Sequence, residues 1–145
     1  MPRKESKRRK QASAVPFRMT AGGIEFCLIT SRRSGKWGFP KGMIERGETL
    51  AEAALKEASE EAGLQGRILS TPLGRYKYSK WKTKLLVTAV LMEVTQTATE
   101  WDEMELRDRR WVAPQEARLL LCRETLQHLF DSACTRLTPA IELPA

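Results

Sequence analysis

Hydrophobic and polar positions alternate in segments that predict two strands at the start of the chain. Apolar-rich residues 14–20 and 24–31 flank Ala21-Gly22-Gly23, whose glycine pair suits the positive φ angles of a tight hairpin. Residues 37–42 (WGFPKG) predict a short strand that stops at the proline and glycine, and residues 43–48 predict a polar loop. An antiparallel hairpin and a short third strand are therefore expected before the first helix.

Both ends of that helix are visible in the sequence. Thr49 as N-cap and Glu52 three residues later match the capping-box pattern, and Gly63 supplies a left-handed stop. Small apolar residues recur between them at helical spacing, at Ala51, Ala54, Leu55, Ala58 and Ala62. This narrow stripe predicts a helix that lies close against a sheet.

The second half of the chain predicts more strands and two closing helices. The strands are expected at residues 67–72, 75–78, 84–94 and 106–112, and the amphipathic helices at residues 114–121 and 124–134. Residues 84–94 (KLLVTAVLMEV) are apolar enough to form a central strand. Strands around one helix, followed by a helical pair, indicate a layered α+β domain.

Composition limits the chain to one domain and places most of its charge at one end. With 145 residues, of which 41% are hydrophobic, the chain has material for a single core. The formal charge is +7, and residues 1–10 alone hold six Lys or Arg against one Glu. We expect a disordered basic arm at residues 1–10, a folded domain at 11–136 and a tail at 137–145.

The three cysteines predict neither a disulfide framework nor a zinc site. Cys27, Cys122 and Cys134 are odd in number, widely spaced and set in apolar runs, so buried thiols in a reducing compartment are expected. The basic start is not followed by an apolar segment of signal-peptide type, and no apolar run is long enough to span a membrane. We therefore expect a cytoplasmic protein without membrane contact.

Three glutamates lie close together near the C-terminal end of the predicted helix, where negative charge is unfavourable. Glu57, Glu60 and Glu61 are spaced i, i+3 and i+4, and the last two lie in the final turn, at the negative end of the helix dipole. On an open surface each like-charge pair costs only about 0.2–0.5 kcal/mol, so a solvated face is one explanation. In a cleft, two charges ~6 Å apart repel by roughly 3 kcal/mol, which a divalent cation would remove. Oxygen ligands alone suit Mg²⁺, with Mn²⁺ as a substitute.

The spacing around these glutamates resembles a known family signature. Gly42-x5-Glu48-x7-Lys56-Glu57-Ala58-x-Glu60-Glu61-x-Gly63-Leu64 is similar to the Nudix box, G-x5-E-x7-R-E-U-x-E-E-x-G-U, where U is aliphatic. One position departs, because Lys56 replaces an arginine and loses its planar fork. The resemblance implies a Nudix-type α/β/α sandwich with a mixed sheet, the box helix on one side and the C-terminal helices on the other.

The same resemblance implies hydrolysis of a diphosphate linkage by metal-activated water. The implied metal ligands are Glu57, Glu60, Glu61 and the main-chain carbonyl of Lys41, and the implied structural residues are Gly42, Glu48 and Gly63. His128, the one histidine, is expected to pack on the last helix, so the general base should be a carboxylate. Glu57 is the first candidate. By analogy with family members that use a loop glutamate, Glu105 is the second, with Glu100, Asp102 and Glu103 close by. The implied catalytic set is Glu57, Glu60, Lys56 and Glu105.

Segments outside the box indicate a branch of the family. Phe17-Arg18, Ser31-Arg32-Arg33, Trp37-x-x-Pro40, Lys80-x-Lys82-Thr83 and Arg107-x-Arg109-x-Trp111 are similar to diphosphoinositol polyphosphate phosphohydrolases. Pro40-Lys41-Gly42 also resembles asymmetric dinucleoside tetraphosphate hydrolases. Both imply a polyphosphorylated small-molecule substrate. The basic residues expected to bind it are Arg18, Arg32, Lys41, Lys80, Lys82, Arg107 and Arg109.

Three other functions stay open from the sequence. The chain could be an RNA 5′-pyrophosphohydrolase that holds RNA with its basic arm, or a nucleoside triphosphate pyrophosphatase. The replacement at Lys56 also leaves room for a catalytically weak module that binds polyanions. The sequence allows a monomer or a homodimer.

Overall fold

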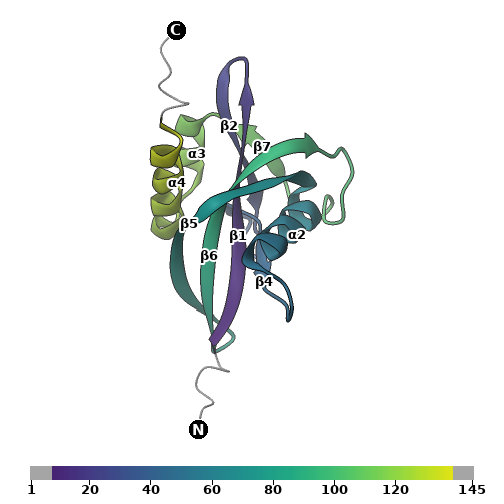
Figure 1. Cartoon of the computed structure of the whole chain (residues 1–145), viewed down its shortest axis with the longest axis vertical. Coiled ribbons are helices and arrows are strands. Elements are labelled where there is room, and N and C mark those ends of the chain that lie inside the picture. Colours follow the sequence, from purple (N-terminus) through teal and green to yellow (C-terminus); the bar gives the residue numbers. More distant parts are fainter. Residues whose placement is uncertain (1–7, 139–145) are drawn as a thin grey trace.

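A computed structural model describes residues 8–138 as a mixed sheet with helices on both faces (Figure 1). The strands are β1 (Arg8–Thr20), β2 (Gly23–Thr30), β3 (Trp37–Gly38), β4 (Lys41–Met43), β5 (Leu64–Lys80), β6 (Thr83–Thr97) and β7 (Arg109–Val112). The helices are α2 (Leu50–Ala62), α3 (Pro114–Leu120) and α4 (Glu124–Arg136).

The strand order is β3-β2-β1-β6-β5, with β4 added to β1 and β7 added to β2. β1 runs parallel to β6, whereas every other pair is antiparallel. β1 also changes partner along its length, because Gln11 to Ser13 pair with β4 and Phe17 to Thr20 pair with β2. Where β1 changes partner, the Pro40 carbonyl accepts hydrogen bonds from the Ala14 amide (3.1 Å) and the Ser13 hydroxyl (2.9 Å). These two bonds hold the start of β4 against β1.

Two apolar layers enclose the sheet, as the sandwich prediction requires. On one face α2 lies close to β1 because its contacting residues are small, and Ala54 and Ala58 are fully buried near Ala12 and Ala14. On the other face α3 and α4 cover larger side chains, where Phe26 meets Phe130 edge to face at 4.7 Å between ring centroids. Figure 1 shows α2 on one side of the strands and the α3–α4 pair on the other.

Several predicted boundaries differ from the structure. β1 begins at Arg8 and pairs with β6 from that residue, so residues 8–10 belong to the sheet; residues 1–7 of the predicted arm and most of the predicted tail lie outside the described residues. The two strands expected at 67–72 and 75–78 form the single strand β5, with an irregularity in pairing between Leu69 and Gly74. The strand expected from residue 106 starts at Arg109, because the preceding residues form turns.

The cysteine prediction is wrong at one position. Cys27 is fully buried, and Cys134 is half-buried, but Cys122 is exposed in the short link between α3 and α4. An apolar neighbourhood in the sequence, Leu119-Leu120-Leu121, did not bury it because the helix ends there. Within residues 8–138, no helix combines the length and apolar character needed to cross a bilayer.

Gly66 marks a position where the sheet should not accept a side chain. Its Cβ would lie 2.0 Å from the Glu93 carbonyl oxygen on β6, at a shift in the β5–β6 register. Because the obstacle is backbone, we expect Gly66→Ala to lower the free energy of unfolding by about 2 kcal/mol in urea titration. Gly22→Ala is the matched control, since its nearest neighbouring atom is 3.8 Å away. Equal stability of the two variants would contradict the prediction.

Candidate active site

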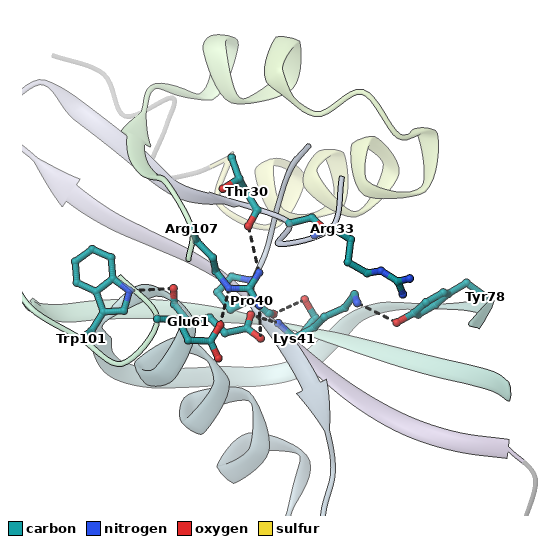
Figure 2. A network of polar contacts seen from close by, with 11 residues as sticks. Thr30, Arg33, Pro40, Lys41, Glu61, Tyr78, Trp101 and Arg107 are labelled. Carbon is teal, nitrogen blue, oxygen red and sulfur yellow. Dashed lines mark hydrogen bonds and ion pairs between the residues drawn. The ribbon is translucent and has the colours of Figure 1, made fainter. Parts of the chain in front are cut away.

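The acidic end of α2 faces the point where β4 leaves β1. Glu61 is 8% exposed, and its carboxylate accepts the Lys41 backbone N–H at 3.1 Å and lies 3.2 Å from the Arg107 guanidinium. Figure 2 shows this polar network running from Trp101 through Glu61 to Lys41 and on to Tyr78. Glu61 therefore connects α2 both to β4 and to the loop before β7.

Glu57 lies against the main chain of Gly42. A Cβ on Gly42 would be only 2.2 Å from the Glu57 carboxylate carbon, with both of its oxygens within 2.5 Å. Glycine is thus required for the carboxylate to approach the peptide between Lys41 and Gly42. The contact brings Glu57 beside the segment whose carbonyl the family resemblance implies as a metal ligand.

The buried carboxyls hold protons more tightly than usual. Burial raises the pKa of Glu61 to about 8, although the nearby Arg107 opposes the rise. The pKa of Glu57 is also raised, first by burial and then by repulsion from Glu60. The charge of Glu57 also raises the pKa of Glu61, so negative charge is crowded at this point.

The donor atoms at this site suit a hard cation, although the described side chains do not form a complete metal site. Within residues 8–138, no three Asp, Glu, His or Cys side chains stand close enough to form a ready-made metal site. The carboxyls of Glu57 and Glu61 supply only oxygen donors, which suits Mg²⁺ or Mn²⁺. Their raised pKa values show that the ionised carboxylates are unfavourable here, and a bound cation would balance their negative charge. Glu60, partly buried on the same turn, is the further carboxylate available.

The loop before β7 brings Glu103 to the site, whereas Glu105 is exposed. The Glu103 amide donates to the Glu60 carbonyl (3.1 Å), and its carboxylate lies 2.8 Å from Arg107. The pKa of Glu57 and that of Glu61 both respond to the Glu103 charge. Of the neighbouring loop acids considered from the sequence, Glu103 is therefore the one that the fold places near the helix glutamates.

Arg107 and Arg109, both predicted to bind substrate, make contacts within the protein in this structure. Arg107 lines the cleft, but its guanidinium is engaged by Glu61, Glu103 and the Thr30 carbonyl (3.2 Å). Arg109 donates to the carbonyls of Ala62 (2.8 Å) and Ala98 (2.9 Å), at the end of α2. The last turn of α2, SEEA, has no basic residue, so Arg109 brings the positive charge that its dipole favours.

Trp101 completes this external cap of α2. Its indole N–H donates to the Glu61 carbonyl at 3.1 Å, and the Arg109 guanidinium stacks 3.9 Å from the ring centroid. Gly63, with φ 67°, ends the helix in the left-handed conformation and leaves room for the same ring.

Two more residues predicted to bind substrate lie away from the cleft lining. Arg18 pairs with Glu25 (2.9 Å) and stacks over Trp111 at 3.9 Å from the ring centroid. Lys82 is exposed in the turn between β5 and β6. Alternation along the strands and the direction of the turn account for both placements, since neither is fixed by the motif.

A cleft of about 450 Å³ adjoins Glu61 and is lined with cations. Its basic lining residues are Arg32, Arg33, Lys36, Lys41, Lys80, Arg107 and Arg123, and among the described lining residues Glu61 is the one acid. Lys36 and Arg123 were missed from the sequence. Arg123 had a detectable signal, because it occupies the N-cap of α4, where a positive charge opposes the helix dipole.

Glu48 and Lys56 form a separate contact beside the site. Their side chains are 2.8 Å apart, and Glu48 also accepts the Glu45 amide at 2.8 Å. The hydrogen bond to Lys56 lowers the pKa of Glu48, and the same contact raises the pKa of Lys56. Lys56 thus fixes the loop that precedes α2.

Burial of Glu57, with repulsion from Glu60, has a measurable effect on stability. The raised pKa means that ionised Glu57 destabilises the fold once the pH exceeds the usual carboxyl value of 4.5. In metal-free buffer we therefore expect Glu57→Gln to unfold at a higher temperature than the parent at pH 8, with no such difference near pH 4. Relief of one like-charge helix pair contributes about 0.2–0.5 kcal/mol. An unfolding temperature of Glu57→Gln that is equal to or lower than that of the parent at pH 8 would contradict this reasoning.

Known proteins are similar to this chain in sequence and in fold. A NUDIX domain signature matches residues 7–131. Nudix hydrolase 4 and Nudix hydrolase 21 (chloroplastic) of Arabidopsis thaliana are each 34% identical, over 87% of this chain and 67% and 68% of their own lengths. The C. elegans Ap4A hydrolase structure superposes with a TM-score of 0.74 at 23% identity, covering 89% of this chain and 98% of that one, which is a likeness of fold. On the domain match and the plant relatives, the chain belongs to the Nudix hydrolase family.

Proposed function

We propose that the chain hydrolyses a phosphoric anhydride bond in a polyphosphorylated small molecule, either a dinucleoside polyphosphate or a diphosphoinositol polyphosphate. The observation that carries the proposal is the meeting of a cation-lined cleft with the buried carboxylate of Glu61. Phosphate oxygens complement the cations, and Glu61 is the carboxylate that lines the same cleft. A polyphosphate lying along the cleft would reach the glutamates.

The side chains divide the task of binding and orientation. Arg32, Lys36 and Lys80 line the cleft and would form charge-assisted hydrogen bonds to phosphate oxygens. The Lys41 ammonium is fixed by the Tyr78 hydroxyl at 2.9 Å, which in turn donates to Gln11 at 2.9 Å. Lys41 would therefore meet a phosphate with little loss of side-chain freedom.

The reaction itself depends on the carboxylates. Glu57, with its raised pKa, would take a proton from the attacking water, with Glu103 as a second acceptor nearby. Mg²⁺, or Mn²⁺ in its place, would be held by Glu57, Glu60, Glu61 and the Lys41 carbonyl, and would neutralise phosphate charge and acidify water. The ion pair of Arg107 with Glu61 keeps that carboxylate in position.

The proposal is tested by a parallel hydrolysis screen with phosphorus NMR. The substrates are diadenosine tetraphosphate, a diphosphoinositol polyphosphate, a nucleoside triphosphate and 5′-triphosphorylated RNA, each with Mg²⁺ and with EDTA. We expect Mg²⁺-dependent cleavage of one or both of the first two. Cleavage confined to RNA or nucleoside triphosphate would support the alternatives instead, and no cleavage of any substrate would reject the proposal. The Ap4A hydrolase name of the structural neighbour adds weight to the dinucleoside substrate.

A further inference from the structure

The turn between β5 and β6 carries an unusual residue pair. Trp81 and Lys82 have φ angles of 55° and 64°, so both central residues of this two-residue hairpin loop are left-handed. Such loops favour Asn or Gly, because residues with larger side chains are strained there. A tryptophan at this position is therefore not explained by the needs of the turn.

Packing does not explain Trp81 either. The side chain is 75% exposed, and it belongs to neither apolar core cluster in residues 8–138. The indole contacts Arg33, whose guanidinium lies 4.6 Å from the ring centroid. Arg33 and Lys80, the residue before Trp81, both line the cationic cleft. The indole thus lies beside Arg33 and Lys80 of the cleft lining, with most of its surface open to solvent.

The position of Trp81 relative to Glu61 suits a long, charged ligand. Tyr78 lies three residues before Trp81, or about 10 Å along an extended strand. Its hydroxyl contacts the Lys41 ammonium, and the Lys41 amide contacts Glu61. Tyr78 and Lys41 therefore connect this end of β5 to Glu61, and a phosphate chain that follows these polar groups would link the indole to the carboxylate.

We propose that Trp81, with Arg33, forms a stacking site for the nucleobase of the substrate. An indole and a guanidinium both stack on planar heteroaromatic rings, whereas the saturated ring of an inositol has no such face. This inference rests on the proposed function and narrows it, because it selects the dinucleoside polyphosphate. The phosphate chain then runs along the cations from the base toward Glu61.

The first test separates base recognition from phosphate recognition. Trp81→Ala and Trp81→Phe are compared with the parent for binding of diadenosine tetraphosphate and of inorganic tripolyphosphate, in EDTA to prevent turnover. We expect Trp81→Ala to weaken diadenosine tetraphosphate about tenfold and tripolyphosphate less than about twofold, with Trp81→Phe near the parent. Leu119→Ala, at an 83% exposed apolar residue on α3, is the matched surface control and should change neither affinity. An equal loss for both ligands, or no loss for either, overturns the inference.

A second readout distinguishes this inference from the proposed function. Diadenosine tetraphosphate should quench tryptophan fluorescence in the parent and in Leu119→Ala, and quench less in Trp81→Phe. Trp81→Asn should raise the unfolding temperature, because asparagine accepts the left-handed turn, while it weakens diadenosine tetraphosphate as Trp81→Ala does. Quenching that is unchanged in Trp81→Phe rejects the stacking site even if hydrolysis proceeds. Quenching that depends on Trp81, without hydrolysis of any substrate, keeps the stacking site and rejects the proposed function.

Discussion

Glu61→Gln is expected to lower kcat for a polyphosphate substrate by ~10³-fold, equivalent to ~4 kcal/mol of transition-state stabilisation, while the protein stays folded. Glu61 is the most buried of the three helix glutamates. Glutamine can still accept the Lys41 N–H, but it carries no charge to balance a cation. Steady-state kinetics at saturating Mg²⁺ and substrate measure the change.

The interpretation needs evidence that the fold is intact. Arg107 keeps its 2.8 Å ion pair with Glu103 when Glu61 is neutral, so the loop before β7 should stay in place. Circular dichroism melting should therefore give a transition close to that of the parent. Glu124→Gln makes the same chemical change at an exposed position in α4 and should leave kcat unaltered. Parental turnover in Glu61→Gln would remove this carboxylate from the mechanism.

Gly42→Ala should be the second most damaging change. The added Cβ would overlap the Glu57 carboxylate, so that side chain must leave its position beside the Lys41–Gly42 peptide. Misplacing a reacting group by about 1 Å can cost about 10²-fold in rate, and we expect a loss of that size in kcat. The fold should survive, because the clash is with the end of a flexible side chain.

A double variant isolates the cause. Glu57→Asp shortens the side chain that the new methyl group would meet, so adding it to Gly42→Ala should cost less than the two single losses combined. Independent, additive losses in kcat would show that the Gly42–Glu57 contact is not responsible. Crystallography of Gly42→Ala would then be expected to show Glu57 in its original place.

Local sequence signals were sufficient for α2 and its ends. The Thr49 hydroxyl accepts the Glu52 amide, the Glu52 side chain accepts the Thr49 amide, and Gly63 adopts φ 67°, all as predicted. The layered α+β class also followed from the order of apolar segments, whereas the sandwich and the side on which each helix lies were correctly implied by the family resemblance. These features depend on residues close together in the chain.

Features that depend on distant contacts were not predicted. Arg109 matches a family pattern, yet its guanidinium caps α2 from a strand 47 residues away. Glu103 was one of several loop acids in the sequence, and its placement near the helix depends on a hydrogen bond to Glu60 across the site. Arg123 reaches the cleft only because α4 packs on the sheet face opposite α2. The spacing of residues in the sequence does not show how the loops turn, and so it does not show which groups these side chains reach.

The parallel pairing of β1 with β6 has a consequence for synthesis on the ribosome. Arg8 pairs with Lys84 and Phe17 with Glu93, so β1 cannot pair with β6 until more than half of the chain has been translated, although β2 and β4 are available earlier. Contacts this distant in sequence slow folding and leave strand edges open to other chains in the meantime. Nascent chains halted before β6 should therefore bind chaperones, and protection of β1 from proteases should appear only after β6 has emerged.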